Sequence, residues 1–479
     1  MRVHEVLGAV RGRDRAGYPP SGGTWPLGRL VAVLDCVVIG AGFAGLAAAN
    51  DLVARGKQVL VAEARDRVGG RVLATQIDGQ LIESGGQWIS PGNEQMHELV
   101  RQAGLELVGP REGSLLIRSQ GSVMRSQQSS GHGRTLSPFE TADLGQGVVR
   151  FRRLAERTVS DPTWTAANQT WLAQPLSRWI KTNVRTPAAQ HDFASALSSV
   201  LGAVSSGVEL GDALQASNTG IDLEALFAVG GGLKLRRVVG GMHQLIDHLA
   251  DQVSERIQLD TVVTGISHSD DGVVVHTAGG EQIEARTALV TLPPWLALQL
   301  DYSPQLPEWR YEAVKRTTPG AAIKAFVIYE RPWWRESGLS GQMSADEGTI
   351  RTTFDVTEPD GPGVLTGLFG GAEAVSMSAL GSAARERAFV DSLAAVFGPI
   401  ARQQHTYVDY DWLADPFTRG CHTPHFAPGI WSMNGQQLAE SYGPVHFAGA
   451  EYASKFNGYL EGAIRSGREE AKVIAREIG

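Results

Sequence analysis

The sequence predicts an α/β fold organised around a strand, a glycine-rich turn, a helix and a second strand. Residues Cys36–Ile39 are short, apolar and β-branched, which is typical of a buried parallel strand. A helical stretch follows from about Phe43 to Arg55, and Val59–Ala62 is a second apolar run. These segments together indicate a parallel sheet of the Rossmann-like, doubly wound kind with one dinucleotide-binding unit.

Three glycines in the turn predict a phosphate site. Gly40, Gly42 and Gly45 stand in G-x-G-x-x-G order. The first allows a tight turn, the second lets a pyrophosphate approach the backbone, and the third lets the helix pack on the strand. Free N–H groups at the start of the helix point at that pyrophosphate. The second strand ends in Glu63, 18 residues after Gly45, where a carboxylate accepts hydrogen bonds from an adenosine ribose.

The same stretch resembles the flavin monoamine oxidase family. The resemblance rests on Val-Ile-Gly-Ala-Gly-Phe-Ala-Gly45, then Glu-Ala-Arg-Asp-Arg-Val-Gly-Gly-Arg71, then Glu-Ser-Gly-Gly-Gln-Trp88. It implies FAD as cofactor and a glutathione-reductase-like FAD-binding domain. It also implies an interleaved α+β substrate domain with a mixed or antiparallel sheet. Glu63 would hold the ribose of FAD, and Arg65 and Arg71 would lie along the cofactor.

The resemblance spreads the cofactor residues over the whole chain. Val263 would meet the adenine through its backbone. Cys421 follows a glycine, as does the cysteine that bonds the 8α carbon of FAD in mammalian-type relatives, so a covalent link and a free buried thiol are both open. The predicted set is Gly40, Gly42, Ala44, Gly45, Glu63, Ala64, Arg65, Gly70, Arg71, Gly85, Gly86, Gln87, Trp88, Val263, Trp412, Cys421, Gly449, Glu451, Gly458, Tyr459 and Leu460.

Three residues are the predicted catalytic groups. Lys324 lies in the apolar strand 321–329 on the same face as Phe326, where an ammonium is costly to bury and its pKa should fall. In the family a lysine at this place holds a water against flavin N5; the alternative is an edge strand with Lys324 in solvent. Tyr459 matches one of two aromatic walls that flank the amine. His422 stands where the second wall is usually aromatic, and it adds a titrating group.

The chain is expected to form two domains, each built from separated segments. The FAD-binding domain takes residues 31–90, 235–293 and 411–479, and the substrate domain takes 91–234 and 294–410. Residues 1–30 hold several arginines and no sustained period, which predicts a disordered arm or a start codon placed too far upstream.

Periodicity predicts the elements within these segments. Helices are expected at 94–103, over much of 139–214, after Gly240–Gly241, at 383–397 and at the end of the chain, where Ile464, Gly467, Ala471, Ile474 and Ile478 share a face. Strands are expected at 257–263, 272–277, 282–286, 288–292, 321–329 and 364–369, and an exposed loop at 119–134.

Composition excludes several classes of function. The chain is 42% apolar and 20% charged with a net charge of −8, so nucleic acid and anionic membrane are unexpected partners. Two cysteines make no disulfide framework, and Cys36 is expected to be an inert packed thiol. No metal site is expected, because H-E-x-x-H is absent. The apolar tail of membrane-bound family members is also absent, which predicts a soluble, cytoplasmic protein and allows a homodimer.

The implied function is FAD-dependent oxidation of a small-molecule amine. A hydride equivalent would pass from the amine α-carbon to flavin N5, the imine would hydrolyse to an aldehyde or ketone, and O2 would become H2O2. The presence of a single G-x-G-x-x-G argues against NAD(P)H as the reductant. An L-amino-acid oxidase needs an arginine for the substrate carboxylate, and none is assigned. A polyamine oxidase, a desaturase of the same fold and a non-catalytic flavin-holding scaffold are further alternatives.

Overall fold

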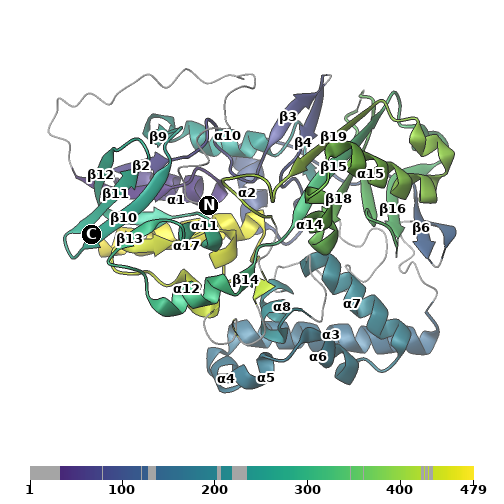
Figure 1. The fold of residues 1–479 in the computed structure, drawn as a ribbon, viewed down its shortest axis with the longest axis horizontal. Coiled ribbons are helices and arrows are strands. Elements are labelled where there is room, and N and C mark those ends of the chain that lie inside the picture. Colours follow the sequence, from purple (N-terminus) through teal and green to yellow (C-terminus); the bar gives the residue numbers. More distant parts are fainter. Residues whose placement is uncertain are drawn as a thin grey trace.

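The computed structural model describes residues 33–77, 79–119, 121–127, 136–201, 207–217, 235–345, 347–359, 361–421, 425–426, 430 and 435–479. Figure 1 shows a sheet with its helices, a second large sheet beside it, and a group of helices below the second sheet. The predicted arm at 1–30 and the predicted wall residue His422 lie outside the described residues.

The first sheet has a parallel centre. Strand β1 (Leu34–Ile39) pairs in parallel with β2 (Val59–Ala62) on one side and with β12 (Gln282–Val290) on the other. Two short parallel strands extend it: β9 (Ile257–Gln258) beside β2 and β21 (Val445–Phe447) beside β12. Because β1 and β2 are central and covered on both faces, their continuous apolar sequence is what such strands require.

An antiparallel extension completes this sheet. Strand β11 (Gly272–Thr277) pairs with both β10 (Val263–Ser269) and the first half of β12, and β13 (Asp301–Ser303) runs parallel to β10. The turn between β11 and β12 contains Gly279 and Gly280, and the two strands form an antiparallel hairpin.

Two helices from opposite ends of the chain pack together on the first sheet. They are α1 (Phe43–Ala54) and α17 (Leu460–Glu477), with α10 (His243–Asp251) beside α1 (Figure 1). A Cβ on Gly467 would overlap the carbonyl oxygen of Ala44, so α17 crosses α1 at backbone contact. The apolar face predicted for the last helix is this contact face.

The second sheet is mainly antiparallel, in the order β19-β15-β18-β17-β16-β6-β7. Strand β15 is second from one edge of this sheet, and it is buried along its whole length between β18 and β19. The strands are β6 (Ser114–Ser119), β7 (Ser122–Gln127), β15 (Ala322–Tyr329), β16 (Leu339–Ala345), β17 (Thr352–Asp355), β18 (Gly363–Gly370) and β19 (Thr406–Asp411). Helices α14 (Gly371–Ser378) and α15 (Ser382–Phe397) accompany it.

The helical group forms below the second sheet and has an aromatic centre. Phe151, Trp179 and Phe193 come from three helices, with ring centroids 5.2–5.8 Å apart. The longest helix starts with a capping box between Ser137 and Glu140, which fixes its first turn. The helices are α3 (Pro138–Ser160), α4 (Pro162–Ala167), α5 (Gln169–Leu172), α6 (Leu176–Asn183), α7 (Pro187–Leu201) and α8 (Leu210–Ser217).

Short elements connect these three parts. They are β3 (Ala74–Ile77), β4 (Gln80–Glu83), α2 (Glu94–Gln102), β5 (Leu107–Val108), β8 (Arg237–Val238), η2 (Ser254–Arg256), α11 (Pro294–Ala297), α12 (Glu308–Lys315), β14 (Thr317–Thr318), α13 (Trp333–Glu336), η3 (Pro399–Arg402), β20 (His425–Phe426), η4 (Gly435–Ala439) and η5 (Ala450–Tyr452). Among the described residues, no helix is long and apolar enough to cross a bilayer.

The predicted α/β class and the central strand–turn–helix–strand unit are confirmed, and three element predictions are wrong. The two strands expected at 282–286 and 288–292 form one continuous strand, β12 (Gln282–Val290). Residues 122–127 form strand β7 where an exposed loop was expected, because Gly121 turns the chain back to pair with β6. The predicted strand 257–263 is broken into the short β9 and the start of β10. Asp260 between them has a positive φ of 54°, which interrupts an extended strand.

The crossing of α1 and α17 gives a stability prediction. Gly467→Ala should lower the free energy of unfolding by about 1–3 kcal/mol, because the added methyl group must push the two helix backbones apart. Gly145→Ala in α3 is the matched control: nothing lies within 4 Å of its Cβ, so the better helix propensity of alanine should raise stability slightly. Chemical denaturation followed by circular dichroism measures both. Equal effects of the two substitutions would contradict the close crossing.

Candidate active and cofactor site

The glycine turn between β1 and α1 has room only for glycine. Gly40 has a φ of 107°, and a Cβ there would lie 2.6 Å from Oγ1 of Thr291. A Cβ on Gly45 would overlap the carbonyl oxygen of Gly40, so the missing side chain lets the helix start directly against the strand. Gly42 and Gly70 lie side by side, with a Cβ on Gly70 placed 3.3 Å from Cα of Gly42. These backbones leave a surface that a ligand can approach closely.

The N-terminus of α1 fits an anion. The helix begins after Gly42, no side chain among the described residues caps it, and its first turn has no acidic residue. The first N–H groups of a helix lack intrahelical acceptors and carry a partial positive charge. A pyrophosphate such as that of FAD supplies the missing acceptors and the matching charge.

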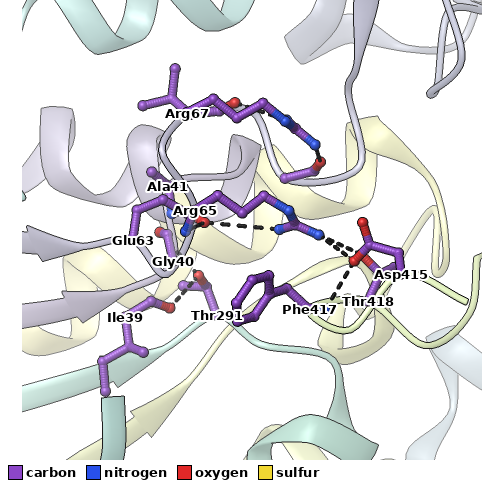
Figure 2. A network of polar contacts seen from close by, with 12 residues as sticks. Ile39, Gly40, Ala41, Glu63, Arg65, Arg67, Thr291, Asp415, Phe417 and Thr418 are labelled. Atoms are coloured by element: carbon purple, nitrogen blue, oxygen red, sulfur yellow. Dashed lines mark hydrogen bonds and ion pairs between the residues drawn. The ribbon is translucent and has the colours of Figure 1, made fainter. Parts of the chain in front are cut away.

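Glu63 ends β2 with its carboxylate fixed beside the glycine turn. Its Oε2 accepts the N–H of Ala41 at 2.8 Å and its Oε1 accepts the N–H of Arg65 at 3.0 Å (Figure 2). The side chain is buried, with 4% of the residue exposed. Two backbone donors therefore hold the carboxylate in one orientation at the place where a ribose would lie.

Arg65 ties this region to the C-terminal part of the chain. Its Nη2 donates to Oδ1 of Asp415 at 2.6 Å and to Oγ1 of Thr418 at 2.8 Å, and its guanidinium lies 5.3 Å from the ring centroid of Phe417 (Figure 2). Burial alone raises the pKa of Asp415, but the charge of Arg65 and the hydrogen bonds from Tyr410 and Thr418 bring that pKa below its ordinary value. In this structure the guanidinium of Arg65 therefore contacts protein side chains.

Arg71 makes a second tie, to Glu451. The pair is bidentate, with Nη1–Oε1 at 2.6 Å and Nη2–Oε2 at 2.9 Å, and the Glu451 side chain is 1% exposed. Arg67, between the two tying arginines, donates to the carbonyl oxygens of Val68, Gly70 and Val72 and so fixes the double-glycine turn. The Arg-x-Gly-Gly-Arg segment thus connects the N-terminal unit with the end of the chain.

Lys324 is enclosed on strand β15 of the second sheet. Its Nζ donates to the carbonyl oxygen of Glu83 at 2.6 Å, to that of Gly85 at 2.8 Å and to Oε1 of Gln87 at 2.5 Å. Nζ also lies 5.5 Å from the ring centroid of Phe326. The alternative of an edge strand with a solvent-exposed lysine is wrong, because β15 is paired on both sides and Lys324 is 9% exposed.

Burial changes the acidity of Lys324. It lowers the pKa of the ammonium to about 7, against the opposing charges of Glu83 and Cys421. Burial also raises the pKa of Glu83, although that carboxylate accepts the N–H of Met242 at 2.5 Å. Three acceptors match the three N–H groups of an ammonium, and a neutral amine keeps only two donors. A proton can therefore enter or leave this group near neutral pH.

The segment Glu83–Gln87, which supplies the acceptors of Lys324, also contains a hydrogen-bond donor without an acceptor among the described residues. Nε2 of Gln87 is buried and has no hydrogen-bond partner in the part of the chain that the structure describes. Gly86 lies against Leu460, whose Cδ atoms would be 3.1 Å from a Cβ at that position. Trp412 is buried and donates from Nε1 to the carbonyl oxygen of Ser84 at 2.9 Å. A buried amide without an acceptor fits a ligand with carbonyl or ring-nitrogen acceptors, such as an isoalloxazine.

Tyr459 and its neighbours form the C-terminal side of the site. Tyr459 precedes α17, and burial raises the pKa of its hydroxyl. Gly458 donates its N–H to the carbonyl oxygen of Ala450 at 2.9 Å, and its φ is 81°. Gly449 has a φ of 142°, at which any side chain would be strained. Its N–H donates to Oγ of Ser466 at 3.1 Å. The second predicted wall, His422, lies in a part of the chain that the structure does not describe.

Cys421 lies close to two cations. Its charge raises the pKa of Lys324 and, together with the larger effect of Glu451 and against burial, that of Arg71. Its N–H donates to the carbonyl oxygen of Gly320 at 2.8 Å, next to the start of β15. Neighbouring positive charges favour the thiolate over the thiol. By contrast, Cys36 is fully buried in β1 and burial raises its pKa to about 12, as expected for an inert packed thiol.

The remaining predicted cofactor residues are Val263, in the first sheet, and Ala44 and Ala64, close to the glycine turn. Val263 is the first residue of β10, pairs with Thr277 and is 8% exposed. It lies close to Glu63, because the N–H of Thr261, two residues earlier, donates to the carbonyl oxygen of Glu63 at 2.8 Å. Ala44 is in the first turn of α1, and Ala64 follows Glu63 directly. The sequence reasoning missed Asp415 and Thr418, whose only signal was their place after Trp412. It also missed Arg67, which stands inside the recognised Arg-x-Gly-Gly-Arg motif.

Comparison with known proteins was made for the whole chain. The family model described as "Flavin containing amine oxidoreductase" matches residues 43–475. The chain is 33% identical over 445 residues to a putative flavin-containing monoamine oxidase AofH of Mycobacterium tuberculosis, covering 92% of this chain and 96% of the relative. It is 30% identical over 456 residues to an L-amino acid dehydrogenase of Synechocystis, covering 92% and 94%.

Solved structures give the same picture. Wild-type putrescine oxidase bound to putrescine has a TM-score of 0.85 at 27% identity, covering 92% of this chain and 98% of that one. Cyclohexylamine oxidase from Brevibacterium oxydans has a TM-score of 0.84 at 28% identity, covering 93% and 99%.

The lowered pKa of Lys324 predicts a pH-dependent stability. Between pH 7 and about 10.4 the unfolded chain binds a proton that the folded chain has lost, so stability should rise with pH by up to about 1.4 kcal/mol per unit. Lys324→Met should lack this rise, and the exposed Lys315→Met should keep it. Denaturant unfolding of the purified proteins at pH 7, 8, 9 and 10 measures it. A constant difference between wild type and Lys324→Met over that range would contradict the lowered pKa.

Proposed function

Because the chain belongs to the flavin-containing amine oxidoreductase family, we propose that it oxidises the carbon–nitrogen bond of a small amine through FAD, with dioxygen as the acceptor. The observation that carries the proposal is the position of Lys324. Its Nζ is held by the Glu83–Gln87 segment, within electrostatic reach of Cys421 and beside the unused donor of Gln87. In this proposal these groups surround the reactive end of the cofactor.

The residues that would hold FAD follow the order of the cofactor. The open start of α1 at Gly42 and the close Gly70 backbone suit the pyrophosphate, and the pinned carboxylate of Glu63 suits the ribose. The backbone at Val263 suits the adenine. When bound, FAD accepts a hydride equivalent from the α-carbon of the amine and passes the electrons on to the acceptor.

The side chains around the reacting carbon orient the amine. In this proposal Tyr459 supplies one partly buried aromatic face, and His422 supplies the other. An amine held between two faces presents one α C–H bond in a fixed direction, which lowers the entropic part of the barrier. The buried Trp412 also helps to exclude water from this part of the site. The histidine wall makes the affinity for amine depend on pH.

Lys324 serves the oxygen half of the reaction in this proposal. A pKa of about 7 lets Nζ exist as ammonium or amine near neutral pH. A water held by Nζ must replace one of its three present acceptors, and Gln87 is the replaceable one because it is a side chain. The ammonium would then place that water and its own positive charge next to the oxygen that is being reduced.

The domain division is part of the proposal. The first sheet takes most of its strands from three separated segments, in β1–β2, β9–β12 and β21, which supports an FAD-binding domain at 31–90, 235–293 and 411–479. Strand β13 (Asp301–Ser303) also joins this sheet, although it lies in the segment proposed for the substrate domain. The second sheet and the helical group support a substrate domain at 91–234 and 294–410.

A second candidate is an amine or amino-acid dehydrogenase that passes its electrons to an acceptor other than dioxygen. One relative at 30% identity is named an L-amino acid dehydrogenase, which favours this alternative. The two candidates share the first half-reaction and differ only in the acceptor. Turnover in air and turnover with a dye acceptor therefore separate them.

The function is tested by mixing the purified flavin-loaded protein with aryl-alkyl amines, aliphatic amines, polyamines and amino acids. At least one amine should bleach the flavin without oxygen and release H2O2 in air. Lys324→Met should then slow reoxidation by dioxygen at least tenfold while reduction changes less, since the variant removes the group that serves only the oxygen step. Stopped-flow absorbance measures both half-reactions. Flavin bleaching with dye reduction but no H2O2 would select the dehydrogenase; no bleaching by any amine would refute both candidates.

A covalent bond between Cys421 and FAD is a further part of the proposal. The neighbouring charges of Arg71 and Lys324 favour the thiolate that such a bond needs. Acid precipitation of the wild type should leave a yellow pellet, and Cys421→Ala should release its FAD into the supernatant. Cys36→Ala is the matched control and should keep the yellow pellet, because Cys36 is packed inside β1. A colourless wild-type pellet would contradict the bond.

A further inference from the structure

A pocket with two arginines lies beyond Trp88. Its lining includes Trp88, Arg111, Arg237, Gln342, Phe354 and Asp355, and we refer to it as the arginine pocket. Strands β5 and β8 pair antiparallel with Val108 opposite Arg237, which brings Arg237 next to the segment that carries Arg111. Arg111 is exposed at the rim, and the Arg237 side chain is only 12% exposed.

The apolar wall of the arginine pocket continues into the active site. Trp88 and Phe354 meet with ring centroids 5.1 Å apart, and both pack on a cluster that contains Phe326. The ammonium of Lys324 lies against that same Phe326 ring. Trp88 also follows Gln87, which accepts a hydrogen bond from Lys324. One side of the pocket is thus one side chain away from the groups that surround Lys324.

The charges of the pocket do not balance. Asp355 is already used: it accepts from Arg335 at 2.8 and 3.0 Å, from Nε1 of Trp334 at 2.9 Å and from the N–H of Thr357 at 2.9 Å. These four donors satisfy its carboxylate, and Arg335 cancels its charge.

Arg237 is less fully used than Asp355. Among the described residues its side chain donates one hydrogen bond, from Nη1 to Oε1 of Glu358. At 3.4 Å this is a long contact, and the carboxylate is partly exposed. A guanidinium has five N–H donors, so a largely buried one with a single long bond retains donors for a ligand. Arg237 also lowers the pKa of Lys324 and of Glu83, so its charge reaches the reacting end of the site.

We propose that Arg237 binds the carboxylate of the amine substrate, so that the enzyme prefers amines that carry an acidic group. This inference rests on the proposed function and names its substrate class. The pocket is a small cavity of about 20 Å³, which suits the oxygens of one carboxylate. Arg237 pairs with the carboxylate, while the Trp88 and Phe354 rings contact the carbon chain of the substrate. A second ammonium, as in a diamine, is repelled.

Binding is tested without any turnover, by isothermal titration of the flavin-loaded protein with 3-phenylpropionate and with its neutral match 3-phenylpropanamide. The wild type should bind the acid more tightly than the amide, and Arg237→Gln should lose about 10- to 100-fold for the acid alone, the range for a hydrogen-bonded charge. Arg237→Lys should retain part of the preference, since it keeps the charge and loses the two-pronged geometry. Arg236→Gln is the matched control: this neighbouring side chain is exposed, and the acid should bind it as it binds the wild type.

Turnover supplies the second readout. Two pairs differ only in the carboxylate: L-phenylalanine with 2-phenylethylamine, and 4-aminobutyrate with butylamine. In at least one pair Arg237→Gln should raise KM for the acidic member by the same factor as in binding, with kcat and the neutral member unchanged. An equal loss for acid and amide, or a wild type that does not distinguish them, overturns the inference. If no amine is turned over, the proposed function fails, and the acid–amide preference still decides the role of Arg237.

Discussion

The buried ammonium of Lys324 constrains the whole site. Its three acceptors come from a single short segment, the end of β4 and the residues after it, while the lysine itself belongs to β15 of the second sheet, a strand that is paired on both sides. A buried charge is tolerated only where its donors are paired, so the segment Glu83–Gln87 and strand β15 must meet in one register. That register fixes where Gln87 points and where Trp88 begins the wall beyond it.

Two arginine–carboxylate ties hold the rest of the site against this centre. Arg65 with Asp415 and Arg71 with Glu451 each join a residue just after β2 to one near the end of the chain. Both pairs are largely buried, and the removal of one partner would leave the other charged and alone. The glycine turn, the strand that carries Glu63 and the segment before α17 therefore act as one unit. These ties bring three separate parts of the chain together, so residues that are distant in sequence can form one cofactor site.

The sequence allowed the local structural units to be predicted, but not the contacts between residues that are distant in the chain. The turn at Gly40–Gly45 and the strand-end Glu63 could be predicted because their spacing is dictated by one short unit of backbone. The burial of Lys324 was predicted from the apolar strand around it, yet its acceptors at 83–87 could not be, since nothing local connects them. Asp415 and Thr418 were missed for the same reason. Strand β7 was missed because its polar sequence suits an edge strand as well as a loop, and only its pairing with β6 distinguishes the two.

The crossing of α1 and α17 has a consequence for synthesis in the cell. The N-terminal unit emerges from the ribosome first, but the surface of α1 around Ala44 is covered by the last helix, and β12 gains its neighbour β21 from the same final part of the chain. The nascent sheet must wait, with one apolar helix face uncovered, until translation has finished. A ribosome that stalls late would thus leave a chain that chaperones and proteases can recognise, so loss of the C-terminal helix should remove the protein from the cell rather than yield a weakened enzyme.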